Sequence, residues 1–315
     1  MSVRHALLVS AYCFGIAACG NSPAFLDAPA GDAAPEADAS TALGPLFRFA
    51  VVGDTRPSNE DDLAGYPTAV ITKIWADVEA SSPHPDFAIS TGDYMFAGPN
   101  TVPSTVDKQL DLYLGARAQF TNATFPVIGN HECTGATASN CGAGARDGIT
   151  LNYAEFMRRM LIPHGITTPY YAIAFAASDD SWTMKLVFVA GNAWSDTQAA
   201  WLDGALAAPT TYTFVVRHES SIVNNAPGVV PSEAILARYP VTLRIVGHTH
   251  TYAHYATRHE VICGNGGAPL SSGFGFGYAI IERLASGAIQ LTERDSTTNA
   301  VVDQFRLNAD GSPAP

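Results

Sequence analysis

Five short stretches of the sequence place aspartate, asparagine or histidine directly after an apolar run. They are Gly53-Asp54, Gly92-Asp93, Gly129-Asn130-His131-Glu132, Arg217-His218 and Gly247-His248-Thr249-His250. Carboxylate, amide and imidazole groups are ligands that Zn, Mn and Fe accept in proteins. Two histidines spaced i, i+2 after a strand rarely fit a core, so His248 and His250 indicate metal binding more strongly than a single aspartate does. The candidate metal ligands are therefore Asp54, Asp93, Asn130, His218, His248 and His250.

Taken singly, most of these stretches have a simpler interpretation. A Gly-Asp pair at a strand end is commonly a turn with a capping aspartate, and a lone His218 could be a buried histidine bonded to backbone. The order of all five along the chain favours the metal-binding interpretation over these alternatives.

The elements that must position these side chains can be read from the spacing of apolar residues. Apolar runs predict buried strands at residues 47–52, 87–91, 125–128, 184–190, 212–216 and 241–246, and helical spacing predicts helices over 67–80, 105–120, 153–161, 197–206 and 232–239. Asp196 is the expected N-cap of the helix at 197–206. A β-hairpin or meander is expected from Gly277 to about Phe305, with a turn at Ser286-Gly287. Strands that alternate with helices predict a layered α/β domain. The polar stretches follow the carboxyl ends of strands, where open α/β sheets bind ligands.

The series of motifs resembles the calcineurin-like metallophosphoesterase superfamily over roughly residues 47–255. Val-x-x-His at 215–218 and Gly-His-x-His-x-Tyr at 247–252 are spelled most like the purple acid phosphatase branch. The resemblance implies an α/β/β/α sandwich with mixed sheets. It also implies hydrolysis of phosphate mono- or diesters by a hydroxide activated at a dinuclear site of Fe, Mn or Zn.

The resemblance also implies a role for each matching residue. Asp93 bridges the two metals, Asp54 and His250 complete one site, and Asn130, His218 and His248 complete the other. Asn130 and His131 contact the substrate phosphate, and His131 protonates the leaving oxygen. Glu132 or another carboxylate is expected to fix the tautomer of His131.

The sequence departs from the family at the first metal. Relatives carry Asp-x-His where this chain has Asp54-Thr55-Arg56, and Phe96 replaces the tyrosine of purple acid phosphatases, so no tyrosinate colour is expected. Arg56 could bind the substrate phosphate, or it could pair with Asp54 and abolish the first metal. The second alternative corresponds to a catalytically weak or inactive surface protein that binds a phosphorylated ligand or partner.

Residues outside the motifs receive weaker predictions. Arg217 and Glu219 flank His218 and are expected at the surface. Tyr252, His254 and Tyr255 are expected either to line the cleft or to pack.

The amino-terminal residues predict export. An apolar run ends at Ala17-Ala18-Cys19, which looks like a lipobox, so residues 1–19 are expected to be a lipoprotein signal peptide with lipidation at Cys19. An ordinary secretory signal peptide is the alternative. Residues 20–45 are rich in Ala, Pro and Asp and predict a flexible tether, followed by the metallophosphoesterase domain at 46–308. The expected location is the bacterial cell envelope, with membrane contact only through the lipid anchor.

Charge and cysteine spacing complete the expectations. The formal net charge of −12, without a run of Lys or Arg, argues against nucleic acid as a partner and leaves a small phosphate ester as the expected substrate. Cys133 and Cys141 favour a loop disulfide in an oxidising compartment over a soft metal site. Cys263 is expected to be buried and unpaired.

Overall fold

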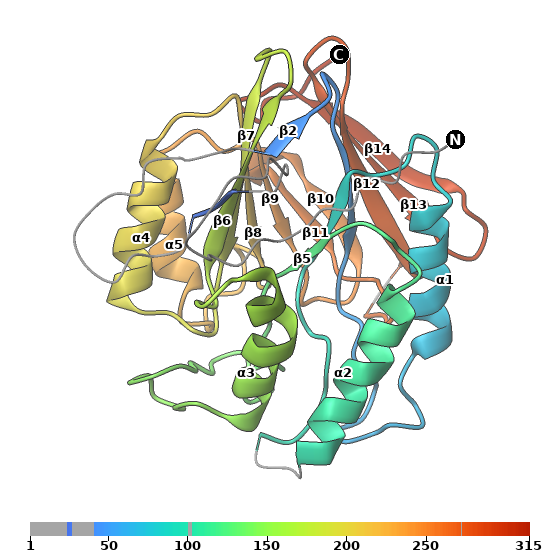
Figure 1. Cartoon of the computed structure of the whole chain (residues 1–315), viewed down its shortest axis with the longest axis vertical. Helices are drawn as coiled ribbons and strands as arrows, with labels where there is room; N and C mark the ends of the chain where they lie inside the picture. The colour runs from blue at the N-terminus through green and yellow to red at the C-terminus, as the bar shows by residue number, and fades with distance from the viewer. Residues whose placement is uncertain (1–23, 27–40, 100–102, 272) are drawn as a thin grey trace, which may run out of the picture.

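The structure, a computed structural model, describes residues 24–26, 41–99, 103–271 and 273–315. Its core consists of two mixed β-sheets packed face to face (Figure 1). The first sheet runs in the order β1 (Ala24–Leu26), β6 (Tyr171–Ala177), β7 (Thr183–Val189), β8 (Tyr212–Arg217), β9 (Leu243–Val246), β11 (Glu260–Cys263) and β10 (Tyr252–Tyr255), with β2 (Thr41–Leu43) also on β6. The second runs β14 (Val301–Leu307), β13 (Ile289–Asp295), β12 (Gly277–Arg283), β3 (Arg48–Val52), β4 (Phe87–Ser90) and β5 (Thr124–Pro126).

Helices cover the outer faces of both sheets. Figure 1 shows α4 (Asp196–Ala207) and α5 (Val229–Leu236) outside the first sheet, and α1 (Thr68–Glu79) and α2 (Pro103–Arg117) beside the second. The chain also forms α3 (Leu151–Phe156), a π turn (Met157–Leu161) and short 3₁₀ turns at Ile162–His164 and Ala256–Arg258. This arrangement confirms the predicted α/β/β/α sandwich.

Aromatic rings fill the space between the two sheets. Phe49 and Phe87 of the second sheet stack with ring centroids 5.0 Å apart, and Phe87 stacks on Phe175 of the first sheet at 4.7 Å. Phe49 also meets Phe214 edge to face at 5.3 Å. Because each buried aromatic side chain contributes a large apolar area, these contacts hold the two sheets in a fixed relation.

Most predicted elements are present with shifted ends, and one cap was wrong. Helix α4 is capped by Ser195, whose side chain accepts a hydrogen bond from the Gln198 N–H, and Asp196 lies inside the first turn. The predicted helix over 153–161 divides into α3 and the π turn. Strand β6 has no counterpart in the prediction, although Tyr171, Ile173 and Phe175 alternate with alanines at the period of a strand.

The sheet takes in parts of the predicted tether. Strand β1 pairs with one half of β6 and β2 with the other, so short segments of residues 20–45 add to the free edge of the first sheet. At the other end, Leu307 bridges to Pro313. Strand pairing therefore extends beyond residues 46 and 308, the limits predicted for the domain. Residues 1–19, including Cys19, lie outside the described residues. In the described ranges, no helix is long and apolar enough to cross a bilayer.

Candidate metal centre

The strands that carry the predicted ligands end at a common place. Strands β3, β4 and β5 run parallel in one sheet, and β8 and β9 run parallel in the other. Main-chain hydrogen bonds join the loops that follow, from the Asp54 N–H to the Gly92 carbonyl at 3.1 Å and from the Gly247 N–H to the His218 carbonyl at 2.8 Å. The His248 N–H donates to the Asp54 carboxylate at 2.9 Å and so links the ends of the two sheets.

Two groups of potential metal ligands form there, and they share one residue. Asp93, His218 and His248 form one group, and Asp54, Asp93 and His250 form the other. Within each group the ligand atoms lie within 4.8 Å of one another. One aspartate shared by two adjacent groups is the arrangement that a bridging carboxylate requires.

Asn130 belongs spatially to the group of His218 and His248, called here the second site. Its Oδ1 lies 3.1 Å from His218 Nε2 and 3.0 Å from His248 Nδ1. Its amide nitrogen donates in the opposite direction, to the Gly135 carbonyl at 2.6 Å. The carbonyl oxygen of Asn130 therefore faces the two imidazoles.

The ring nitrogens that point away from the centre have acceptors. His218 Nδ1 lies 2.7 Å from the Thr91 carbonyl, and His250 Nδ1 lies 2.9 Å from the Pro269 carbonyl. A carbonyl partner fixes the proton on Nδ1 and leaves Nε2 available to a metal. This donor set, with lone pairs turned inward, fits one cation at each group.

Backbone strain is concentrated at the same residues. Asp54, Asp93, His248 and His250 have positive φ angles of 56°, 57°, 71° and 46°. Residues other than glycine rarely adopt this region, and such conformations tend to persist where function requires them.

Two glycines make room for the ligands. Gly92 has a φ of 101°, and a Cβ on Gly247 would lie 2.3 Å from Asp54 Oδ2. A larger residue at 247 would therefore displace the Asp54 carboxylate.

The two aspartates of the centre have opposite pKa shifts. Burial raises the pKa of Asp54 well above its usual value. Burial acts in the same direction on Asp93, but the positive charges of His218 and Arg56 outweigh it and hold the pKa of Asp93 well below the usual value. Asp93 is thus a carboxylate at neutral pH, as a bridging ligand must be.

The pKa values of His218 and His248 shift in opposite directions. Burial opposes protonation of His218, but the nearby Asp93 carboxylate, 3.2 Å away, more than offsets it and raises the pKa of His218 well above 6.5. Burial lowers the pKa of His248 to about 4, so its imidazole is neutral.

These pKa shifts predict that metal binding releases protons. At pH 7 His218 is protonated in the metal-free protein, and a cation can bind its Nε2 only after that proton leaves. We expect at least one proton to be released per protein, and apparent affinity to increase from pH 6 to pH 8. Calorimetric titration with Zn²⁺ in buffers of different ionisation enthalpy measures the number of protons. A heat that does not depend on the buffer would contradict the prediction.

His131 lies beside the shared aspartate and outside both ligand groups. Its Nε2 is 3.9 Å from Asp93 Oδ2, and burial lowers its pKa to about 4. Its Nδ1 has no hydrogen-bond partner among the described residues. Of the expected partners of His131, Glu132 or another carboxylate, the structure excludes Glu132, because its carboxylate faces the main chain, and places Asp93 beside the ring.

Glu132 instead holds the loops that carry the ligands. Its carboxylate is fully buried and accepts hydrogen bonds from the N–H groups of Asp93 and Gly129, both at 2.9 Å, and of Tyr94 at 2.8 Å. A buried carboxylate satisfied by several main-chain donors fixes the loop conformation on which Asp93 depends.

Arg56 is paired with Asp93, whereas the alternative drawn from the sequence was a pair with Asp54. Its Nε lies 3.6 Å from Asp93 Oδ2, and its guanidinium lies over the Phe96 ring at 4.8 Å from the centroid. The Phe96 ring also meets the imidazole of His131 edge to face, with centroids 4.4 Å apart. Phe96 thus supports both polar groups on the Oδ2 side of Asp93.

The two residues that flank His218 are buried, contrary to expectation. Arg217 is 2% exposed and binds Ser232 and Glu233 on α5. Glu219 is fully buried. No local pattern in the sequence indicates that Arg217 would reach α5.

The residues that follow the last motif turn away from the centre. The Tyr252 hydroxyl donates to Asp303 at 2.7 Å, and His254 stacks on Phe305 with centroids 3.5 Å apart. Tyr255 lies at the end of β10 beside the Arg258 guanidinium, 5.9 Å from the ring centroid. Packing is therefore the interpretation that the structure supports for these side chains.

The cysteine predictions are confirmed. Cys133 and Cys141 form a disulfide with Cα atoms 5.6 Å apart, and Cys263 is free and buried. The disulfide closes a loop that begins directly after His131 and Glu132.

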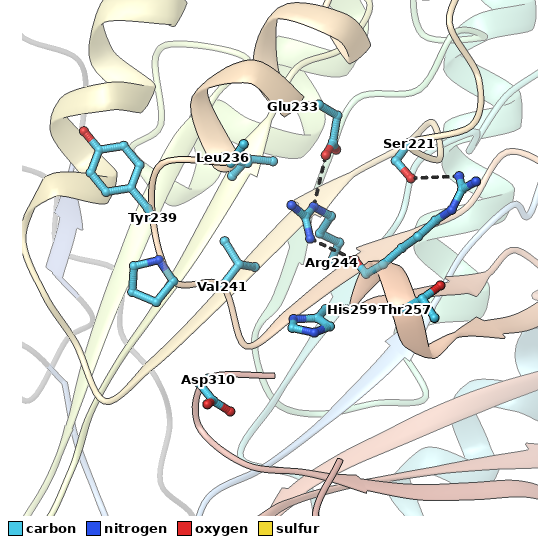
Figure 2. Close-up of a pocket in the computed structure, with 12 residues that line it drawn as sticks. Ser221, Glu233, Leu236, Tyr239, Val241, Arg244, Thr257, His259 and Asp310 are labelled. Carbon is cyan, nitrogen blue, oxygen red and sulfur yellow. Dashed lines mark hydrogen bonds and ion pairs between the residues drawn. The ribbon is translucent and has the colours of Figure 1, made fainter. Parts of the chain in front are cut away.

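Two surface cavities are lined by residues outside both ligand groups. The first, about 480 Å³, opens between α5, β9 and the turn at Ala256–Arg258 (Figure 2). Its arginines are already engaged, since Arg244 pairs with Glu233 at 3.3 Å and Arg258 donates to Ser221 at 3.5 Å. The second, about 550 Å³, lies beside residues 140–146 of the disulfide-bonded region.

The chain belongs to the calcineurin-like phosphoesterase family, whose sequence profile matches residues 47–252. No curated protein matches the chain significantly.

Solved structures share the fold at low sequence identity. A purple acid phosphatase from yellow lupin (Lupinus luteus) seeds aligns with a TM-score of 0.58 and 15% identity, over 89% of this chain and 58% of that one. A dimetal phosphatase from Danio rerio aligns with a TM-score of 0.53 and 14% identity, over 84% of this chain and 99% of that one. GAP50, described as the anchor in the inner membrane complex of Plasmodium, aligns with a TM-score of 0.54 and 15% identity, over 84% and 89%. This chain therefore spans less than two thirds of the lupin enzyme.

Proposed function

We propose that this protein hydrolyses phosphate esters and depends on two metal ions held around Asp93. The observation that carries the proposal is the pair of adjacent ligand groups that share this carboxylate. Asp54 and His250 complete the first site, and Asn130, His218 and His248 complete the second. When bound, two such cations supply an activated water and stabilise the attacking and leaving oxygens of a displacement at phosphorus.

The side chains on the Oδ2 side of Asp93 suit substrate binding. Arg56 provides a fixed positive charge, held over Phe96, and a guanidinium can bind two phosphate oxygens. His131 is buried and neutral, so it can donate an N–H to the phosphate or to the leaving oxygen. Both groups are already in place before substrate arrives, which favours transition-state stabilisation.

A second candidate function is binding without turnover. The ion pair between Arg56 and Asp93 favours it, because a guanidinium at Oδ2 competes with a cation for the same carboxylate. GAP50, whose fold is similar, is described as the anchor in the inner membrane complex of Plasmodium, and an anchoring role as such needs no turnover. In that case Arg56 takes the place of the first metal and the site binds a phosphorylated ligand or partner.

Turnover of chromogenic esters distinguishes these functions. The protein is incubated with p-nitrophenyl phosphate and with bis(p-nitrophenyl) phosphate after loading with Mn²⁺, Zn²⁺ or Fe, and then again after chelation and dialysis. We expect hydrolysis that is lost on chelation and restored by metal. Metal content of nearly two ions per chain, measured by mass spectrometry, should accompany it. No turnover with any metal would favour binding without catalysis.

Arg56→Met tests the role of the guanidinium directly. If Arg56 contacts phosphate, we expect kcat/KM for the dianionic monoester to fall about 10- to 100-fold. The fall should be smaller for the diester, because its phosphate carries one negative charge fewer for Arg56 to bind. Arg238→Met, a change to an exposed arginine just past the C-terminal end of α5, serves as the control. A rise in metal content and activity in Arg56→Met would show instead that Arg56 excludes the first metal.

We also propose that the protein acts outside the cytoplasm as a lipoprotein anchored through Cys19, with no other membrane contact. The disulfide between Cys133 and Cys141 supports an oxidising compartment. Metabolic labelling with an alkyne fatty acid in a bacterial host should mark the wild-type chain and leave Cys19→Ala unlabelled.

A further inference from the structure

The loop closed by the disulfide, residues 133–141 and called here the disulfide loop, lies against the second site. It begins immediately after the stretch that contains Asn130 and His131. Its ends are tied by the bond between Cys133 and Cys141. Its interior residues are therefore restrained from both ends.

The disulfide loop orients Asn130 through a main-chain carbonyl. The Gly135 carbonyl accepts from the side-chain Nδ2 of Asn130 at 2.6 Å, and the Gly135 N–H donates to the main-chain carbonyl of Asn130 at 2.9 Å. Gly135 has a φ of 86°, which a residue with a side chain would adopt only with strain. Because the amide nitrogen is held, the Asn130 oxygen stays directed at His218 and His248.

The same loop reaches His248 through a hydroxyl. Thr137 Oγ1 lies 3.4 Å from His248 Nε2, while His248 Nδ1 faces His218 Nε2 at 3.2 Å. When His248 binds metal through Nδ1, its proton is on Nε2, and this N–H donates a hydrogen bond to the Thr137 hydroxyl. The other two histidines of the centre use carbonyls outside the loop, those of Thr91 and Pro269. His248 alone among the three is oriented by a side chain of the disulfide loop.

The far side of the loop is anchored to the first sheet. Asn192, which follows β7 and is fully buried, donates to the carbonyls of Thr137 at 2.8 Å and Ser139 at 3.0 Å. The Cys141 N–H donates to the Asn192 carbonyl at 2.8 Å. Thr137 is thus held between the disulfide, Asn192 and His248.

We propose that the disulfide loop positions two ligands of the second site, with Thr137 as the positioning residue for His248, and that the Cys133–Cys141 bond sets how tightly this site binds metal. The inference rests on the proposed function, since it assumes that Asn130, His218 and His248 hold a cation. Reduction of the disulfide then weakens the second site and leaves the first intact, because His250 is oriented by Pro269.

The expected loss of metal affinity can be judged from residues that hydrogen-bond to metal ligands in other proteins. Removing a group that fixes the proton and orientation of a ligating imidazole typically lowers metal affinity about 10- to 100-fold. Thr137→Val removes the hydroxyl and keeps the shape. Thr137→Ser keeps the hydroxyl. Thr134→Val is the matched control, because Thr134 lies in the same loop and, within the described part of the chain, its hydroxyl accepts only from the Ala136 N–H, at 3.4 Å.

The test measures Zn²⁺ affinity by competition with a chromophoric chelator, together with metal content by mass spectrometry. Each variant is also measured in a His250→Ala background, in which only the second ligand group is complete. We expect Thr137→Val to bind about 10-fold or more weakly at the second site, Thr137→Ser to regain most of the affinity, and Thr134→Val to match wild type. Wild-type affinity in Thr137→Val would overturn the positioning role.

The contribution of the disulfide is tested with the double variant Cys133→Ser, Cys141→Ser, which avoids thiol reductants that bind metal. We expect the affinity of the second site for Zn²⁺ to fall at least about 10-fold, while the circular dichroism spectrum stays unchanged. Unchanged affinity would overturn the role of the bond. If the wild-type protein binds no metal, the proposed function itself is wrong. If the wild-type protein binds metal and the variants bind it equally well, only the role of the disulfide loop is wrong.

Discussion

Asp93→Asn is expected to remove both metal sites and to lower kcat/KM for p-nitrophenyl phosphate by about 10³-fold or more. Asp93 is the residue that the two ligand groups share, so its loss leaves each group incomplete. Asparagine is nearly isosteric and neutral, so it bridges two cations poorly and leaves His218 and Arg56 without their counter-ion. Metal content and kinetics, measured on the same preparation, check the prediction.

Comparison with two further aspartate variants makes the Asp93 result specific. Asp54→Asn removes a ligand from only the first group, so we expect it to lower the metal content toward one ion per chain. Asp179→Asn changes an exposed turn residue and should leave metal content and activity unchanged. If Asp93→Asn retained two metals, the carboxylate would not be the bridge, and the proposed arrangement of the centre would be wrong.

Glu132→Gln should produce the largest loss of stability. The Glu132 carboxylate accepts from the N–H groups of Asp93, Gly129 and Tyr94, and all of these atoms are buried. Glutamine offers one acceptor oxygen, and its NH₂ group would face main-chain donors. We expect the free energy of unfolding to fall by about 3 kcal/mol, since buried donors lose their acceptor.

The Glu132 measurement is best made by urea denaturation at pH 8. Burial, together with the charge of Asp93, raises the pKa of Glu132 to about 7, so the wild-type side chain is ionised at pH 8. Glu60→Gln, at an exposed position, is the control and should unfold like wild type. Metal affinity should fall along with stability, because the same hydrogen bonds fix the loop that carries Asp93. Wild-type stability in Glu132→Gln would show that the loop does not depend on the carboxylate.

The electrostatic balance of the centre has a physical consequence for metal loading. Two buried aspartates and the buried His218 lie close to the half-buried His248 and His250. Burial raises the pKa of Asp54, while Asp93 keeps its charge through His218 and Arg56. In the metal-free protein, a protonated His218 therefore stands where a cation would neutralise Asp93. Exchange of that proton for metal connects loading to pH, as the calorimetric prediction states.

The types, order and spacing of the candidate ligands could be read from the sequence. Asp54, Asp93, Asn130, His218 and His248 each follow an apolar strand, and the carboxyl ends of parallel strands meet at one edge of a sheet. The same local reasoning located the disulfide, because the seven intervening residues, mostly small and flexible, allow Cys133 and Cys141 to meet. These features depend on neighbouring residues and on general rules of strand packing.

Only the tertiary structure decided which distant side chains meet. The pairing of Arg56 with Asp93, the main-chain contacts of Glu132 and the contact of Thr137 with His248 all depend on loop conformations that no local pattern encodes. The burial of Arg217 under α5 and the pairing of β1 and β2 with β6 likewise arise from surfaces that are far apart in the chain. Sequence periodicity reports which face of an element is apolar, whereas these contacts are set by how complete elements pack against one another.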